Sequence, residues 1–243
     1  MARLPDNKPL LCYITDGPSL PARGGGLVPS SAAKTPSAAE GSGAEGSLGV
    51  GGPRGELLLL IEQAIAAGVD LIQIRERHLS TRALLALVEA AVARARGTAT
   101  RILVNDRLDV ALAAGAGLHL PTHGFPVAGV RRAYPALLIG ASCHNRDELH
   151  RAEAGGADFI VFGPVFETPA KKPYGPPLGL EKLREAVGAA KIPVLALGGV
   201  TLANAAACLA AGAAGLAAIS LFQHAADLAD TVRRLRALGS AQE

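Results

Sequence analysis

Short apolar runs alternate with helix-patterned segments along almost the whole chain, and this alternation restricts the fold more than any other feature. Apolar runs that fit buried strands span residues 10–15, 70–75, 101–105, 117–120, 137–142, 158–163, 193–198 and 215–219. Segments with helical spacing span residues 56–67, 81–95, 108–114, 127–133, 146–154, 180–189, 202–211 and 226–238. Because the connections are short, the strands should run parallel, and the pattern predicts a single (β/α)8 TIM barrel.

A doubly wound open sheet is the other fold that such an alternation allows. That fold often carries a GxGxxG motif after its first strand, and this chain has none there. A pattern of Ala and Gly, often followed by Asp, also precedes the second, fourth, sixth and eighth expected strands. In each case a glycine would end the preceding helix and redirect the chain into the strand, which favours the barrel.

Residues 18–53 differ from the rest of the chain, being composed largely of Gly, Ser, Ala and Pro. With so few large apolar residues, this segment cannot bury enough surface to offset the entropy lost on ordering. A strand precedes the segment and would otherwise have no partner, so we expect a disordered insertion within one domain spanning residues 1–243. A functional lid is the alternative.

Composition argues against several classes of function. The chain has 24 basic and 21 acidic residues and no basic run interleaved with aromatics, so nucleic acid is not an expected partner. The first residues lack the apolar region of a signal peptide, and no apolar run of about 18 residues occurs, so we expect a cytoplasmic protein that does not enter a membrane. Disulfides and zinc are not expected, because no CxxC pair occurs among Cys12, Cys143 and Cys208. Association into a homo-oligomer is left open.

Polar residues follow nearly every expected strand. Because the carboxyl ends of parallel barrel strands meet at one face, these residues predict an active site there. The residues are Thr15, Asp16, Gln73, Arg75, Glu76, Arg77, Asn105, Asp106, Arg107, His119, Ser142, His144, Thr168, Lys171, Lys172, Gly198, Gly199 and Ser220. A purely structural protein would have no reason to place so many polar groups at these positions.

Small residues after the last two strands predict a phosphate site. Gly198 and Gly199 would let backbone N–H groups approach an anion, and Ser220 adds a hydroxyl after the eighth strand. In this fold, phosphate is commonly held by the loops after strands seven and eight. Tight-turn glycines and a helix-capping serine are the structural alternative.

Cationic residues after the second and sixth strands fit an anionic substrate. Arg75 and Arg77 offer planar guanidinium groups, and Lys171 offers a mobile point charge. We expect at least one of them to contact the substrate. The alternative is a set of ion pairs with acidic residues of the same rim, namely Glu76, Glu167 and Asp106.

Two further positions are candidates for chemistry. Asp106, after the third strand, could bind Mg²⁺ together with substrate phosphates, or it could instead cap the next helix. His144, after the fifth strand, carries an imidazole that suits acid–base catalysis. His119 lies on the fourth strand, where it would point into the barrel or bond to its rim. Cys143 is a poor nucleophile partner for His144, because adjacent strand residues point to opposite faces.

Seven motifs, in order, resemble those of the thiamine phosphate synthase/TenI family. They are residues 13–16, 73–76, 105–107, 140–144, 163–168, 198–199 and 218–220, and the resemblance covers the chain apart from residues 18–53. It implies a (β/α)8 barrel that binds a thiazole phosphate. The synthases of this family join hydroxymethylpyrimidine diphosphate to thiazole phosphate with Mg²⁺ and release pyrophosphate. The tautomerases aromatise a thiazole carboxylate phosphate by proton transfer and need no metal.

Three stretches depart from the synthase pattern that the resemblance implies. Arg77 stands where synthases carry lysine, and residues 121–124 (PTHG) replace Gly-Gln-x-Asp, whose Asp is a magnesium ligand. Residues 168–171 (TPAK) replace Thr-x-Thr-Lys and lack one hydroxyl. These stretches are more similar to the tautomerase branch, whose proton-moving histidine matches His144. Asp106 and Pro164, by contrast, resemble the synthases.

The leading expectation is therefore a TenI-like thiazole tautomerase of thiamine biosynthesis, an isomerase that needs no cofactor. His144 would be catalytic, and phosphate would bind at Gly198, Gly199 and Ser220. The residues expected to bind the rest of the substrate are Arg75, Arg77, Asn105, Ser142, Thr168 and Lys171. The first alternative is a thiamine phosphate synthase, a transferase in which Asp106 binds Mg²⁺. The second is a relic that binds the phosphate ligand without catalysis.

Overall fold

A computed structural model describes residues 4, 9–17, 53–168 and 176–240 of the chain. Within these residues the strands are β1 (Leu10–Ile14), β2 (Leu71–Ile74), β3 (Arg101–Asn105), β4 (Gly117–Leu120), β5 (Ile139–Cys143), β6 (Phe159–Phe162), β7 (Val194–Leu197) and β8 (Gly215–Ala218). The helices are α1 (Pro53–Ala66), α2 (Thr81–Ala95), α3 (Leu108–Ala114), α4 (Val127–Ala133), α5 (Arg146–Ala154), α6 (Gly179–Ala189), α7 (Ala205–Ala210), α8 (Ser220–Gln223) and α9 (Leu228–Ser240).

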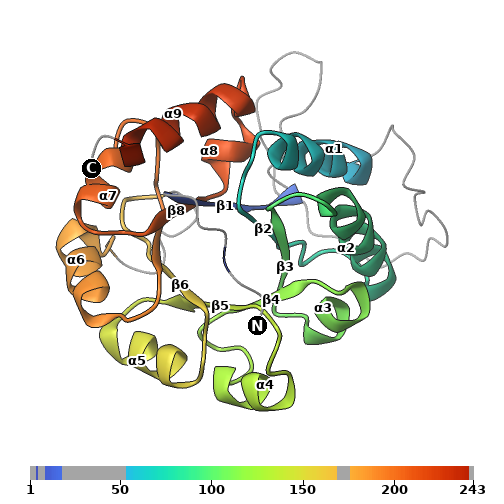
Figure 1. Ribbon diagram of the computed structural model, residues 1–243, viewed down its shortest axis with the longest axis horizontal. Helices are drawn as coiled ribbons and strands as arrows, with labels where there is room; N and C mark the ends of the chain where they lie inside the picture. The colour runs from blue at the N-terminus through green and yellow to red at the C-terminus, as the bar shows by residue number, and fades with distance from the viewer. Residues whose placement is uncertain (1–3, 5–8, 18–52, 169–175, 241–243) are drawn as a thin grey trace, which may run out of the picture.

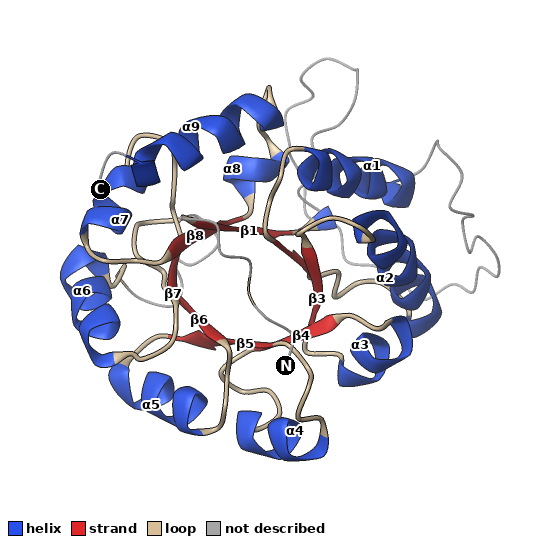
Figure 2. Cartoon of the chain, viewed as in Figure 1, coloured by secondary structure: helices blue, strands red, loops and turns tan. Residues whose placement is uncertain are grey.

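The strands close into a barrel in chain order, and each runs parallel to both of its neighbours. Figure 1 and Figure 2 show the helices as a ring around this barrel. The predicted (β/α)8 barrel is confirmed. Of the insertion expected at residues 18–53, residues 18–52 lie outside the described residues, and Pro53 is the first residue of α1. Among the described residues, none of the helices has the length and apolar character needed to cross a membrane.

Two apolar cores hold the barrel together, because successive strand residues point to opposite faces. The larger core lies between the strands and the helix ring, and it includes Leu11, Ile72 and Val104. The smaller core fills the barrel interior, and it includes Leu103, Phe159 and Leu195. Phe159 reaches across to β5, where a Cβ atom on Gly140 would lie 2.3 Å from the Phe159 ring. Glycine at position 140 therefore makes room for the largest side chain of the interior core.

Glycines before every second strand confirm the predicted pattern of helix endings. Gly68, Gly115, Gly156 and Gly212 precede β2, β4, β6 and β8, with φ angles of 82°, 68°, 89° and 94°. These angles lie in the left-handed region that side-chain-bearing residues rarely adopt. Each glycine thus redirects the chain from a helix into a strand, as the repeated Ala-Gly pattern predicts.

The aspartates that follow two of these glycines anchor the barrel at the amino ends of its strands. Asp70 accepts a hydrogen bond from the backbone N–H of Leu11 on β1 and pairs with Arg236 of α9, both at 2.7 Å. Asp158 does the same with the N–H of Ile139 on β5 and with Arg131 of α4, again at 2.7 Å. The same anchor therefore occurs twice, four strands apart. The opposite end of the barrel is left for other polar groups.

Two departures from the predicted elements follow β7 and β8. Helix α7 begins at Ala205 rather than at residue 202, because the Asn204 side chain accepts from Thr201 N–H and donates to the Gly199 carbonyl. These bonds form a turn that competes with the first helical turn. The short helix α8, which begins at Ser220, was not predicted, because four residues are too few to show helical periodicity.

Candidate active site

The mouth of the barrel, where the carboxyl ends of the strands meet, is polar on one side. On β2, β3, β4 and β5 the last inward-facing side chains are those of Gln73, Asn105, His119 and Ser142, which we call the polar arc. The apolar arc is formed across the mouth by side chains of the interior core from β1, β6 and β7 and just after β8, namely Ile14, Val161, Leu197 and Ile219. A ligand in the mouth therefore meets hydrogen-bonding groups on one side and hydrocarbon on the other.

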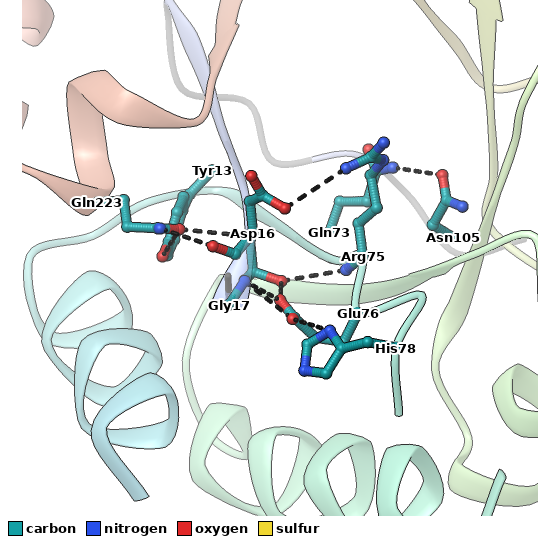
Figure 3. Close-up of polar contacts among 10 residues, drawn as sticks. Tyr13, Asp16, Gly17, Gln73, Arg75, Glu76, His78, Asn105 and Gln223 are labelled. Atoms are coloured by element: carbon teal, nitrogen blue, oxygen red, sulfur yellow. Dashed lines mark hydrogen bonds and ion pairs between the residues drawn. The ribbon is translucent and has the colours of Figure 1, made fainter. Parts of the chain in front are cut away.

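Gln73 and Asn105 form the first pair of the polar arc. Gln73 is 3% exposed, and its Nε2 donates to Asn105 Oδ1 at 3.0 Å (Figure 3). No described residue bonds to Gln73 Oε1, which is also buried. Because an unsatisfied buried carbonyl is unfavourable, this oxygen is suited to accept a hydrogen bond from a ligand.

His119 and Ser142 form the second pair. His119 is 2% exposed, and its Nε2 lies 2.8 Å from Ser142 Oγ. Its ring packs against Phe159 of the interior core, with the ring centres 6.2 Å apart. Burial lowers the pKa of His119 from its ordinary value of 6.5 to about 4, so the imidazole is neutral at physiological pH. The prediction that His119 points into the barrel or bonds to its rim is confirmed.

A buried carboxylate fixes the corner between β1 and β2. Glu76 accepts a hydrogen bond from the Thr15 hydroxyl. It also accepts from the Gly17 backbone N–H, as Figure 3 shows. Thr15 Oγ1 in turn accepts from the backbone N–H of Arg75 at 3.1 Å. Burial raises the pKa of Glu76, whereas the hydrogen bonds from Thr15 and Gly17 lower it. Glu76 thus holds together the two loops that carry Asp16 and Arg75.

Arg75 is the cation that the structure places beside this corner. Its Nη1 lies 3.8 Å from Asp16 Oδ1, and its side chain is 30% exposed. The alternative that it pairs with Glu76 is not the arrangement found, because the ion pair is with Asp16 (Figure 3). Burial and the nearby charge of Arg77 lower the pKa of Arg75. A bound anion would favour the charged form of Arg75, since it would offset two neighbouring positive charges. Arg77 itself is exposed.

Asp106 lies just beyond β3, in an unusual backbone conformation with φ 59°. It does not cap the next helix, because Arg107 occupies the N-cap position of α3. A Cβ atom added to Gly124, in the loop after β4, would lie 2.8 Å from Asp106 Oδ1. Asp106 and residue 124 are therefore direct neighbours, and a carboxylate at position 124 would face that of Asp106.

The described residues contain no group of three His, Cys, Asp or Glu side chains that could hold a metal ion. A metal bound by protein ligands alone therefore does not fit this part of the chain. Mg²⁺ that enters with a diphosphate needs only one or two protein carboxylates, because phosphate oxygens and water complete its coordination. Asp106, which is exposed and next to the mouth, fits that requirement.

His144 follows β5 and is held by two hydrogen bonds. Its backbone N–H donates to Glu148 Oε2 at 2.7 Å, and its ring Nδ1 contacts the carbonyl oxygen of Gly163 after β6. Because a carbonyl only accepts, Nδ1 carries a hydrogen, and Nε2 is the nitrogen that can offer a lone pair. Cys143 packs in the larger core, between the strands and the helix ring, and burial raises its pKa to about 12. It is therefore unsuited to act as a nucleophile with His144.

The loops after β7 and β8 carry the residues that the sequence predicts to bind phosphate. Gly198 and Gly199 have φ angles of 96° and 63°. A Cβ atom added to Gly198 would lie 2.5 Å from Pro164 Cβ, and one added to Gly199 would lie 2.5 Å from the Glu167 carbonyl oxygen. The glycines are thus required by backbone conformation and packing, whatever they bind. Ser220 is exposed at the start of α8 and receives no capping role. Thr168 is half-buried in the loop after β6, and Lys171 lies outside the described residues.

Several polar contacts at the mouth were not anticipated from the sequence. Gln223 of α8 accepts from the Tyr13 hydroxyl and donates to the Asp16 carbonyl, joining α8 to the end of β1 (Figure 3). The pairing of Gln73 with Asn105 was also missed. A polar residue two positions after an interior leucine, as in Leu71-Ile72-Gln73, is the signal that could have found it. No comparable signal exists for Gln223, because its helix was not predicted.

The sequence matches one family model, described as "Thiamine monophosphate synthase", over residues 50–222. A thiamine-phosphate synthase of Moorella thermoacetica is 41% identical over 181 residues, which cover 74% of this chain and 86% of that protein. The thiamine-phosphate synthase of Chloroflexus aurantiacus is 40% identical over 185 residues, with 76% of this chain and 86% of that protein covered.

Solved structures agree with these sequence matches. The thiamine phosphate pyrophosphorylase of Pyrococcus furiosus superposes with a TM-score of 0.74 and 29% identity, and the match covers 97% of both chains. A 3-hexulose-6-phosphate synthase matches with a TM-score of 0.57 at 22% identity, which shows a shared fold alone. The family model and the two sequence relatives cover about three quarters of the chain, including the polar arc. The chain therefore belongs to the thiamine monophosphate synthase family of thiamine biosynthesis.

Proposed function

We propose that this chain is a thiamine-phosphate synthase, the transferase that joins hydroxymethylpyrimidine diphosphate to thiazole phosphate and releases pyrophosphate. The observation that carries the proposal is the 41% identity to the thiamine-phosphate synthase of Moorella thermoacetica over 74% of this chain. The comparisons thus favour the first alternative expected from the sequence over the tautomerase, which was the leading expectation.

The two sides of the mouth support a flat heterocyclic substrate. Gln73 Oε1 is a buried acceptor without a described partner, and it would bind a hydrogen-bond donor on the pyrimidine. Ser142 offers a hydroxyl farther along the polar arc. Val161 and Leu197 of the apolar arc would contact the rest of the ring. A pocket that is mostly apolar with a few placed polar groups is typical of small-molecule sites.

The reaction itself calls for charge stabilisation. The bond between the pyrimidine methylene carbon and a diphosphate oxygen breaks, and the thiazole nitrogen forms a bond to that carbon. Negative charge therefore develops on the departing pyrophosphate and positive charge on the pyrimidine. Arg75, which lies at the rim beside Asp16, would interact with the pyrophosphate. Backbone N–H groups near Gly198 and Gly199 would hold the phosphate of the thiazole.

Asp106 would contribute the protein carboxylate to Mg²⁺ that enters with the diphosphate. The metal, when bound, would offset part of the negative charge of the leaving group. The neighbouring position is Gly124 in this chain, so it supplies no second carboxylate. We therefore expect a requirement for higher Mg²⁺ concentrations than a site with two carboxylates would show.

The test is pyrophosphate release by the purified full-length chain from hydroxymethylpyrimidine diphosphate and thiazole phosphate. Release should require both substrates and Mg²⁺, and chelation of the metal should abolish it. A matched variant, Asp106→Asn, should lower the rate and raise the Mg²⁺ concentration needed for half-maximal activity. A wild-type protein that binds thiazole phosphate but releases no pyrophosphate would contradict the proposal.

A thiazole tautomerase is the second candidate, and His144 is the observation in its favour. The contact with the Gly163 carbonyl leaves His144 Nε2 with a lone pair, as a base that moves a proton requires. A tautomerase would convert a thiazole carboxylate phosphate without Mg²⁺, and His144→Gln would abolish that conversion. If neither reaction occurs, the remaining expectation is a protein that binds a phosphate ligand without catalysis.

A further inference from the structure

The bond between His119 and Ser142 has a direction that determines what Ser142 can offer to a ligand. His119 is buried, and its ring makes one hydrogen bond among the described residues, from Nε2 to Ser142 Oγ at 2.8 Å. The other ring nitrogen, Nδ1, is buried without a partner in this part of the chain. A neutral imidazole ring has one N–H, and its hydrogen is either on Nδ1 or on Nε2.

The two tautomers leave different groups unsatisfied. With the hydrogen on Nδ1, a buried N–H donor would have no acceptor, and such orphaned donors are rare in folded proteins. With the hydrogen on Nε2, only a lone pair on Nδ1 lacks a partner, and that nitrogen lies in the apolar surroundings of the Phe159 ring. The second arrangement also gives Nε2–H an acceptor, Ser142 Oγ. It therefore leaves the less costly group unpaired.

We infer that His119 is a positioning residue that makes Ser142 a hydrogen-bond donor toward the ligand in the barrel mouth. His119 Nε2–H donates to Ser142 Oγ, so the hydroxyl hydrogen of Ser142 is left to point elsewhere. No described residue accepts that hydrogen, and the Ser142 side chain is half-buried at the mouth. The ligand would present an acceptor, such as the lone pair of a pyrimidine ring nitrogen. The identity of this ligand rests on the proposed function, whereas the direction of the bond does not.

The reverse bond would remove this donor. If Ser142 donated to His119, its oxygen would offer lone pairs only and could bind ligands with N–H groups at this position. With His119 as the donor, the hydroxyl hydrogen stays available for a ring nitrogen without hydrogen, and the oxygen keeps one further lone pair. A ring nitrogen without hydrogen would lose its partner if the bond were reversed, and an unpaired acceptor in a water-poor site is costly, so the histidine tautomer decides whether such a ligand is accepted.

The direction of the bond is measured by NMR on the full-length protein labelled with ¹⁵N in its histidine rings. Signals of His119 are assigned by their loss in His119→Gln. At pH 7 we expect the hydrogen on Nε2 and the lone pair on Nδ1. His144 serves as an internal reference, because its contact with the Gly163 carbonyl predicts the opposite tautomer. A hydrogen on Nδ1 of His119 would overturn the inference, whether or not the protein has synthase activity.

The functional consequence is measured with paired variants in the pyrophosphate-release assay. Glutamine can place an amide N–H near the position of Nε2, whereas leucine cannot, so His119→Gln should retain kcat/KM within about fivefold and His119→Leu should lose about tenfold or more. In a Ser142→Ala background, His119→Leu should add less than about a threefold further loss. Thermal unfolding of each variant identifies loss of folding. Losses that multiply would show that His119 does not act through Ser142.

The NMR measurement and the pyrophosphate-release assay test the inference and the proposed function separately. If the wild-type chain releases no pyrophosphate, the proposed function fails, and the NMR result still decides the direction of the bond. If it releases pyrophosphate but His119 carries its hydrogen on Nδ1, the positioning role fails and the synthase assignment stands.

Discussion

The two histidines of the mouth show how a single neighbour decides what a side chain can do. His119 faces a hydroxyl that can donate or accept, and His144 faces a carbonyl that can only accept. The sequence identified both residues, and it predicted the position of His119 because it lies within a strand pattern. It could not predict the tautomers, because Ser142 lies on β5 and Gly163 just after β6, and they reach the histidines only when the strands pair.

Burial of His119 predicts a loss of stability in acid. The unfolded chain binds a proton at this residue below its ordinary pKa of 6.5, whereas the folded ring resists protonation until about pH 4. The free energy of unfolding should therefore fall as the pH drops through this window, by about 2 kcal/mol between pH 7.5 and 5 from this residue. Denaturant unfolding at both pH values checks this in the wild type and in His119→Gln. Equal acid sensitivity of the two proteins would contradict it.

The absence of a side chain at Gly124 leaves room for the carboxylate of Asp106, so a methyl group at this position should displace that carboxylate. In Gly124→Ala the new Cβ would lie 2.8 Å from Asp106 Oδ1, and the carboxylate must move. If the proposed function holds, kcat/KM for pyrophosphate release should fall about tenfold and the half-maximal Mg²⁺ concentration should rise, because Asp106 would no longer meet the metal as before.

Gly129 in α4 is a matched control, since an added Cβ there meets nothing within 4 Å. Gly129→Ala should leave activity unchanged and raise the free energy of unfolding by about 0.5 kcal/mol, because alanine favours a helix over glycine. An unchanged Mg²⁺ response in Gly124→Ala would exclude Asp106 as the metal's carboxylate.

At the scale of elements, the repeated aspartate anchor explains why the strands keep their register. Asp70 and Asp158 each accept a hydrogen bond from the backbone N–H of the preceding strand and pair with an arginine of the helix ring, from α9 and α4 respectively. The sequence pattern predicted the glycines that end the helices, because their requirement is local. It gave no sign of these arginine partners, since Arg236 lies 166 positions from Asp70 and only the closed barrel brings them together.

Loss of either anchor should destabilise the barrel more than loss of a surface ion pair. Asp70→Ala leaves the Leu11 N–H and Arg236 without this partner, and because the carboxylate is buried we expect a cost of about 3 kcal/mol. Asp158 is 16% exposed at its side chain, so Asp158→Ala should cost less, about 2 kcal/mol. Denaturant unfolding gives both values.

The control is Asp109→Ala, which removes an exposed ion pair with Arg107 and should cost less than about 1 kcal/mol. Similar losses in all three variants would mean that the repeated anchor has no special role.

Over the whole molecule, the barrel arrangement was the most predictable property and the site the least. Eight strand patterns and a 3.6-residue period define the fold, because each is written in consecutive residues. Helix α8 and its residue Gln223 were missed, since a single turn of helix carries no period and Gln223 contacts the end of β1 across the closure of the barrel. The number of carboxylates near Asp106 could not be predicted from the sequence either, because only the fold shows that Gly124 is its neighbour.

The reactivity of the three cysteines provides a test of how tightly the whole barrel is packed. All three are buried, and burial raises the pKa of Cys12 and Cys143 to about 12 and that of Cys208 to about 11. At pH 8 a thiol-specific reagent should label the native protein about 100-fold or more slowly than the denatured chain, because few thiolates form and access is closed. Labelling rates that rise with denaturant in parallel with unfolding would support this. Rapid labelling of one cysteine in native protein would show a local opening of the barrel.

The division of the mouth into a polar and an apolar arc has a consequence for stereochemistry. A planar ring turned over by half a revolution would press its polar edge against Val161 and Leu197 and leave Gln73 and Ser142 facing carbon. Two lost hydrogen bonds at about 1 kcal/mol or more each would leave the inverted pose at a few per cent of the bound molecules or fewer. The reactive carbon of nearly every bound ring would then project toward the same loops, so its two faces are not equally open to attack.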